Sequence, residues 1–176
     1  ATTCLLDRIA HRHGLPLITT PVGFKFLADL FIQDRIMFGG EESASIAVRD
    51  HLPEKDGILA GVLLAEMLAT RGKKLAELVE DLFRTYGERF YVQKTIPLTA
   101  ERARKLKSLA AAPPAKLAGR PVRNCVTIDG VRFDFEEDAW LLLRMSGTEP
   151  IVRCYAESGS RTALRDLVRA GLAVLA

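Results

Sequence analysis

The chain has 176 residues, of which 48% are hydrophobic and 27% are charged, and its formal net charge is +3. These values are typical of a folded globular protein and exclude an intrinsically disordered chain. Its 25 basic and 22 acidic residues form no basic run, which excludes an extended nucleic-acid surface.

Membrane and secretion signals are absent from the sequence. The longest apolar run, 58–67, is shorter than a membrane span and is interrupted by Gly61 and Glu66, and no signal peptide opens the chain. Three widely spaced cysteines without partners at metal-ligand spacing argue against disulfides and zinc. We therefore expect a cytoplasmic protein, and because Ala1 stands where an initiator Met would, we expect a piece of a longer chain.

The first part of the chain alternates helices and strands. Apolar spacing and stop signals predict helices over 4–13 and 24–33, with strands at Pro16–Thr19 and Arg35–Phe38. Such alternation favours an α/β fold with a mixed or parallel sheet and crossover helices. It also places the segment that follows each strand at the carboxyl end of that strand, which is where open α/β sheets bind ligands.

Two further helices complete this part. The nearly all-apolar segment 58–70 predicts a helix in the core, and 74–86 has one apolar stripe at spacings of three and four residues. Gly87 ends the second helix. We place a domain boundary after it, which gives domains 1–87 and 88–176.

The second part predicts a small α+β domain with an antiparallel sheet and packed helices. Strands are expected at 90–96, 122–128, 131–135, 140–145 and 151–156, and helices at 99–111 and from Ser160 to about Leu175. Asp129-Gly130 predicts a two-residue type I′ turn between the second and third strands.

An acidic loop within Phe38–Gly57 contains the first candidate site. Gly39-Gly40 permits a sharp turn, and Glu41, Glu42 and Ser43 follow at once. Carboxylates accept hydrogen bonds and Ser both donates and accepts, so the group suits a polyol such as a sugar. A solvated surface turn is the alternative.

Charged residues after this loop allow more than one interpretation. Lys55 could lie near a phosphate or a reacting hydroxyl, or it could belong to a charged helix start. His51 could shuttle a proton or bind phosphate, although a lone histidine more often does neither. A hard cation could be held by four carboxylates, those of Glu41, Glu42, Asp50 and Asp56. Their spacing matches no known metal loop, so we expect no metal in this chain.

The segment Arg144–Pro150 has the composition of an anion site. Arg144 and Arg153 offer planar forks of donors that match phosphate oxygens. Ser146 and Thr148 add hydroxyls, and Gly147 lets backbone N–H groups turn inward. The alternative is an ordinary loop beside an arginine that pairs with Glu149.

Together these motifs resemble the α-D-phosphohexomutases, the phosphoglucomutase and phosphomannomutase family. The matching stretches are TPVGFK at 20–25, GGEES at 39–43, HLPEKDG at 51–57 and RMSGTEP at 144–150. The resemblance implies domain 3, without its beginning and binding the sugar, at 1–87, and domain 4, binding the phosphate, at 88–176. Neither a TASHNP-type phosphoserine motif nor a DGDGDR magnesium loop occurs in the chain.

The resemblance also implies a role for each candidate residue. Glu41 and Ser43 would bind sugar hydroxyls, with Gly23 and Lys25 beside them. The phosphate would be held by residues of the second domain: Arg144, Ser146, Gly147, Thr148 and Arg153. Lys55 would lie near the transferring phosphoryl group, and His51 would line the cleft.

The implied activity belongs to a longer parent protein. It would interconvert hexose 1-phosphate and hexose 6-phosphate through a phosphoserine enzyme and a bisphosphorylated sugar, with Mg²⁺ bound by a domain absent from this chain. The partners are the hexose phosphate and domains 1 and 2 of the same polypeptide, with no nucleic acid and no membrane. The chain alone is expected to be inactive; the alternative is a non-catalytic sugar-phosphate-binding or regulatory module.

Two positions depart modestly from the family pattern, and Glu42 with the EKDG run bears on specificity. Ala44 stands where the family usually has glycine, and Met145 stands where proline is common. Family members specific for glucosamine phosphate tend to have Gln at the position of Glu42 and to lack the EKDG run. This sequence therefore resembles the glucose and mannose branch.

Overall fold

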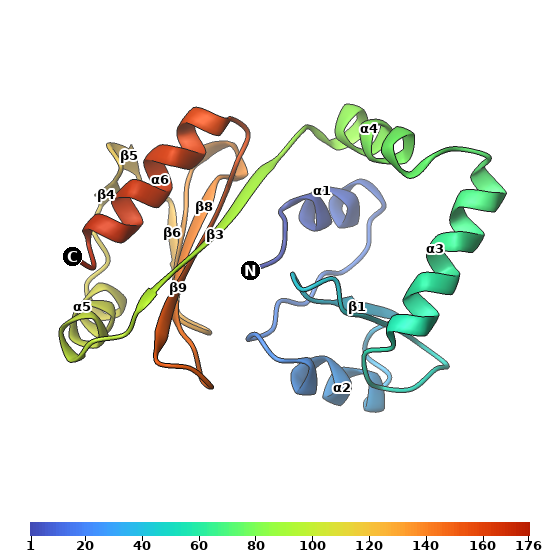
Figure 1. Ribbon diagram of the computed structural model, residues 1–176, viewed down its shortest axis with the longest axis horizontal. Coiled ribbons are helices and arrows are strands. Elements are labelled where there is room, and N and C mark those ends of the chain that lie inside the picture. Colours follow the sequence, from blue (N-terminus) through green and yellow to red (C-terminus); the bar gives the residue numbers. More distant parts are fainter. The chain divides into compact units, whose positions relative to one another are not determined.

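The computed structural model describes residues 1–176, and these residues form two compact units. Unit 1 is Ala1–Gly87 and unit 2 is Glu88–Ala176. None of the helices has the length and apolarity needed to cross a bilayer. Figure 1 labels most of the elements of each unit.

Unit 1 contains four helices and one short hairpin. The helices are α1 (Leu5–Arg12), α2 (Phe24–Ile32), α3 (Gly57–Arg71) and α4 (Leu75–Tyr86), and the hairpin pairs β1 (Phe38–Gly40) with β2 (Ile46–Val48). All four helices lie where the sequence predicts helices. Phe24, Leu27 and Ala47 form a small core with Phe31 and Ile36 packed against it, so α2 holds the hairpin in place.

The sheet of unit 1 differs from the expected one. Its only two strands are antiparallel, and the segment predicted as the strand Pro16–Thr19 joins no sheet. Leu17 and Ile18 of that segment are 48% and 40% exposed, because no strand lies beside them to complete a ladder. The strand predicted at Arg35–Phe38 starts later, at Phe38, because the N–H of Arg35 closes the end of α2 on the carbonyl of Leu30.

Helix α3 is not the core helix that its apolar composition predicts. None of its side chains is buried, and Ile58 is 82% exposed. Composition without a periodic stripe does not specify which face of a helix is covered. By contrast α4 is amphipathic, and the hydroxyl of its Tyr86 is hydrogen-bonded at 3.1 Å to Nε2 of His13, next to α1.

Unit 2 is built on a five-stranded sheet in which every neighbouring pair is antiparallel. The strand order is β3 (Phe90–Pro97), β9 (Ile151–Ser158), β8 (Trp140–Met145), β7 (Val131–Asp134) and β6 (Asn124–Val126). Helices α5 (Ala100–Ala111) and α6 (Arg161–Ala173) pack against it, with N-caps from Thr99 and Ser160. This arrangement confirms the predicted small antiparallel domain.

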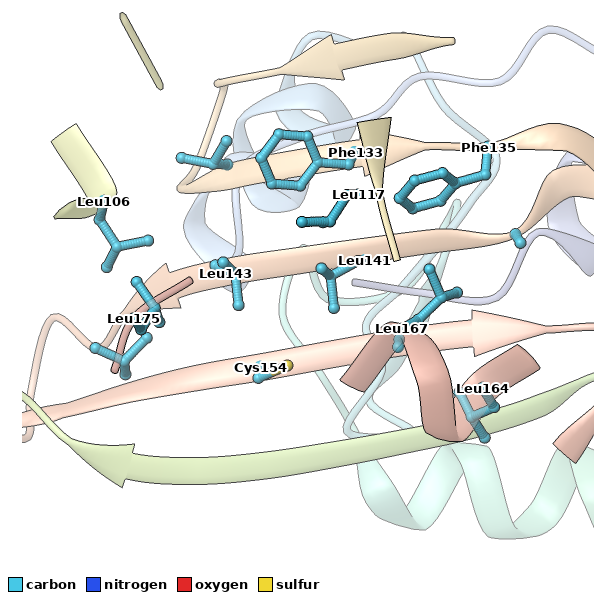
Figure 2. Packing of buried hydrophobic residues seen from close by; sticks show 14 residues of the cluster. Leu106, Leu117, Phe133, Phe135, Leu141, Leu143, Cys154, Leu164, Leu167 and Leu175 are labelled. Carbon is cyan, nitrogen blue, oxygen red and sulfur yellow. The ribbon is translucent and has the colours of Figure 1, made fainter. Parts of the chain in front are cut away.

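The core of unit 2 lies between one face of this sheet and the helices. Leu141 and Leu143 of β8 and Cys154 of β9 belong to one buried cluster with Leu167 of α6, and Figure 2 shows Leu141 beside Leu167. Burial raises the pKa of the Cys154 thiol to about 11, so this thiol stays protonated. Because side chains alternate along a strand, Arg144 is on the opposite face.

Two turns of unit 2 differ from the prediction. Val126 pairs with Arg132, so four residues, 127–130, separate β6 from β7, and the expected two-residue type I′ turn is wrong. Such a turn needs positive φ at both central positions, and only Gly130 has it, at 88°. A true two-residue hairpin occurs instead at Ala118-Gly119, between β4 (Lys116–Leu117) and β5 (Arg120–Pro121).

Candidate functional site

In unit 1 a hydrogen bond joins two of the motifs that the sequence singles out. The N–H of Gly23 donates to Oε1 of Glu41 at 2.9 Å. Glu41 lies in the tight loop between β1 and β2, which is closed by the N–H of Glu41 on the carbonyl of Ser45 at 3.0 Å. The structure therefore brings the TPVGFK and GGEES stretches together at one carboxylate.

Lys55 lies close to the same place. Its Nζ is 5.3 Å from the centre of the Phe24 ring, a cation–π distance, and 3.2 Å from Oε1 of Glu54. Phe24 directly follows Gly23 and is buried. A third predicted stretch, HLPEKDG, thus contacts the TPVGFK stretch through Lys55 and Phe24.

The remaining two sugar-site candidates are exposed. The Oγ of Ser43 is 3.1 Å from the Oγ of Ser45, within the β1–β2 loop. Lys25 is exposed, with its Nζ 4.9 Å from the centre of the Phe26 ring. Both side chains are accessible to a ligand, and no buried contact holds them in one rotamer.

His51 has a local partner. Its Nε2 lies 2.9 Å from Oδ2 of Asp56, while Oδ1 of Asp56 caps α3 by accepting the N–H groups of Ile58 and Leu59. The bond to His51 first, and then the bond from Leu59, lower the pKa of Asp56. The geometry explains His51 as part of a helix cap, so its role in a reaction stays a prediction.

The structure shows no metal centre. No group of three or more His, Cys, Asp or Glu side chains gathers in a way that could hold a metal ion. The four carboxylates considered above for a hard cation form no such group.

In unit 2 the two predicted phosphate-binding arginines lie side by side. Arg144 on β8 is directly opposite Arg153 on β9. Each has a carboxylate partner at 2.7 Å: Nε of Arg144 donates to Oδ2 of Asp129, and an Nη of Arg153 donates to Oε2 of Glu149. The bond to Glu149 raises the pKa of Arg153, which keeps the guanidinium charged.

The loop between these strands has accessible donors. Ser146 is anchored by its N–H on the carbonyl of Ile151 at 2.9 Å, and its Oγ is 3.4 Å from Oγ1 of Thr148. Gly147 and Thr148 are exposed, and a Cβ at Gly147 would meet no atom within 4 Å. The Nε of Arg153 is buried, and the nearby Tyr155 hydroxyl is, after the bond to Glu149, the second cause of the raised pKa of Arg153.

Two contacts, one in each unit, are absent from the sequence-based prediction. Asp129 is predicted only as a turn residue, and Phe24 only as the start of a helix, yet they contact Arg144 and Lys55. The available signal for Asp129 is strand register, because its turn leads into the strand that pairs with β8. No local sequence signal indicates the contact of Phe24.

Comparison with known proteins identifies the family. The model of phosphoglucomutase/phosphomannomutase alpha/beta/alpha domain III matches residues 1–86, and the model of the phosphoglucomutase/phosphomannomutase C-terminal domain matches residues 97–171. Unit 1 therefore matches domain III of this class of protein, and unit 2 matches its C-terminal domain. The chain belongs to the phosphoglucomutase/phosphomannomutase family.

Individual relatives agree with this assignment. A phosphoglucomutase/phosphomannomutase of Thermococcus kodakarensis is 33% identical over 99% of this chain and 36% of its own length. A probable phosphoglucosamine mutase of Methanosphaera stadtmanae is 31% identical over 95% of this chain and 35% of its own length. The chain thus spans about a third of the length of the relatives that it matches.

Solved structures show the same likeness. A Thermus thermophilus protein assigned as a phosphomannomutase superposes with a TM-score of 0.78 at 35% identity, over 99% of this chain and 35% of that one. The open form of the Paramecium phosphoglucomutase pp63/parafusin superposes with a TM-score of 0.78 at 25% identity, over 99% of this chain and 36% of that one.

Proposed function

We propose that this chain is the substrate-binding half of a phosphoglucomutase/phosphomannomutase that interconverts hexose 1-phosphate and hexose 6-phosphate. The observation that carries the proposal is the pairing of Arg144 with Arg153 beside the loop Ser146–Thr148, in which Gly147 and Thr148 are exposed. Two guanidinium groups, two hydroxyls and an open glycine backbone form a donor set that matches a phosphate dianion. In this proposal unit 2 binds the phosphate of the substrate.

Unit 1 binds the sugar in the same proposal. The bond from Gly23 uses one oxygen of the Glu41 carboxylate, and the second oxygen can accept from a sugar hydroxyl. Ser43 adds an exposed hydroxyl in the same loop. Lys55, whose Nζ lies over the Phe24 ring, supplies a positive charge that would contact the transferring phosphoryl group.

The chemical steps belong to the longer parent protein. Transfer would use a serine that is phosphorylated and a magnesium loop, and the sequence contains neither motif. The residues of this chain also do not fit a magnesium site. We therefore assign binding to this chain, assign no step through the metal to it, and expect it to be inactive alone.

Substrate preference is part of the proposal. Glu42 and the EKDG run favour glucose and mannose phosphates over glucosamine phosphate. Assaying the parent protein on all three hexose phosphates tests this preference. Fastest turnover of the amino sugar would contradict it.

Titration of the ¹⁵N-labelled chain with glucose 6-phosphate tests the binding role. We expect amide shifts at Ser146–Thr148 in the wild type, their loss in Arg144→Ala, and no loss in Arg169→Ala. Arg169 is the matched control, because it is an exposed arginine of α6 that pairs with Asp166. Equal responses in the two variants would contradict phosphate binding by Arg144.

Catalytic tests separate the enzyme from the alternative of a binding module. The purified chain should show no mutase activity, and a measurable rate free of host enzyme would contradict its assignment as a binding half. Upstream sequence containing the serine motif and the Asp-rich loop supports the enzyme. An unrelated upstream domain supports the binding module.

A further inference from the structure

Strand register brings the β6–β7 turn to the side of Arg144. Val131 on β7 pairs with Leu143 on β8, and the two strands are antiparallel. One step past this pair, Gly130 therefore comes opposite Arg144, and Asp129 lies next to it. The turn lies on one side of Arg144, and Arg153 on β9 lies on the other.

Gly130 makes this close approach possible. Its φ is +88°, a conformation that side-chain-bearing residues rarely adopt. A Cβ there would lie 2.5 Å from the carbonyl oxygen of Leu143 and 3.0 Å from Cα of Arg144. Backbone atoms cannot give way as a flexible side chain can, so this position requires glycine.

The close approach of the turn to β8 allows Asp129 and Arg144 to form an ion pair that is largely shielded from solvent. Oδ2 of Asp129 accepts from Nε of Arg144 at 2.7 Å, and the side chains are 25% and 15% exposed. Charge-assisted bonds of this kind are stronger than neutral ones. The guanidinium is therefore held along its Nε edge.

This geometry leaves the far end of the guanidinium for a ligand. Arginine has five N–H donors, one on Nε and four on the terminal nitrogens. The bond to Asp129 is made by Nε and does not involve the four N–H groups of Nη1 and Nη2. The terminal fork can therefore bind two oxygens of an anion.

We propose that Asp129 is a positioning residue for Arg144. It holds the Nε edge, orients the terminal nitrogens, and balances the charge of Arg144 beside Arg153. This inference rests on the proposed function, because it assumes that Arg144 binds phosphate. Asp129 itself does not touch the substrate.

The test uses Asp129→Asn in the 176-residue chain, with Asp134→Asn as the matched control. Asp134 also accepts from an arginine Nε at 2.7 Å, from Arg132, at similar exposure and on the same sheet. The readouts are the Nε–Hε resonance of Arg144 and titration with inorganic phosphate. Asn keeps the shape of the side chain but removes its charge.

We expect Asp129→Asn to shift the Arg144 Hε resonance and to weaken phosphate binding by roughly tenfold, the size expected for a bond to a charged group. Asp134→Asn should leave both unchanged. Equal or tighter binding in Asp129→Asn, or equal weakening in Asp134→Asn, overturns the inference.

Arg144→Ala separates this inference from the proposed function. If Arg144→Ala weakens phosphate binding and Asp129→Asn does not, Arg144 binds phosphate without help from Asp129. If Arg144→Ala has no effect, the proposed function fails first. Intact dispersion of the core amides in each spectrum verifies that the variants are folded.

Discussion

Arg144 and Arg153 stand directly opposite each other in the β8–β9 pair. Side chains at such positions have Cβ atoms about 4.5–5.5 Å apart, and like charges there repel. Asp129 and Glu149 each neutralise one of the two guanidinium groups at 2.7 Å. The two carboxylates thus offset the repulsion and allow two arginines, whose donors suit an anion, to stand side by side on one face of the sheet.

Inorganic phosphate should stabilise unit 2, because a ligand that binds only the native state adds stability. At ten times its dissociation constant the gain is about 1.4 kcal/mol, which raises the Tm of a domain of this size by roughly 6 °C or more. The fluorescence of Trp140, the single and fully buried tryptophan, reports unfolding of unit 2. Arg153→Ala should reduce the gain and Arg169→Ala should not; equal gains would contradict the assignment of Arg153.

Glu41 and Glu42 are adjacent and should respond differently to truncation. Glu41→Ala removes the acceptor of the Gly23 N–H, so we expect a loss of about 1 kcal/mol and faster hydrogen exchange at Gly23. Glu42 makes no hydrogen bond or ion pair, so Glu42→Ala should stay within about 0.5 kcal/mol. Amide exchange and urea unfolding measure both. Unchanged exchange at Gly23 in Glu41→Ala would contradict this contact.

Ala44 should gain stability when replaced by glycine. Its φ is +64°, and this left-handed conformation costs a residue with a Cβ about 1–2 kcal/mol. Ala44→Gly removes that strain, partly offset by the greater freedom of glycine in the unfolded chain, so we expect a gain of about 0.5–1 kcal/mol. Ala118→Gly, at φ +54°, is the parallel case in unit 2. A loss of stability in Ala44→Gly by urea unfolding would show that the loop is not strained.

Acid should weaken the start of α3 through Asp56. The pKa of this carboxyl is lowered below its ordinary value of 3.8, first by the bond to His51 and then by the cap bonds. A lowered native pKa contributes stability that is present above the ordinary value and is lost as the pH falls through the native one.

Replacement of His51 tests this account of acid sensitivity. His51→Ala removes the largest cause of the lowered pKa, so the Asp56 carboxyl should titrate closer to pH 3.8. We expect α3 to lose helical structure at a higher pH than in the wild type. Side-chain carboxyl NMR and far-UV circular dichroism from about pH 2 to about pH 5 measure this, and identical titration curves would refute it.

Local sequence patterns predict most elements of this fold correctly. Apolar spacing and capping residues locate the six helices, and alternation locates β3, β8 and β9. These signals succeed because hydrogen bonds within a helix and alternation along a strand depend on residues close in sequence. The predictions fail where the structure of a segment depends on a partner far along the chain. At Pro16–Thr19 no neighbouring strand completes a ladder, so no strand forms. At α3 no neighbouring element buries the apolar side chains, so the helix is not part of a core.

The sequence alone determined the chemistry of the candidate site: a carboxylate and hydroxyl loop at Glu41–Ser43, and an arginine-rich loop at Arg144–Arg153. Only the tertiary structure decided the contacts of these groups. It placed Glu41 on the N–H of Gly23, and Asp129 on Arg144. Residue type specifies which bonds a side chain can form, but strand register and loop closure, which depend on packing across the chain, specify which partner it meets.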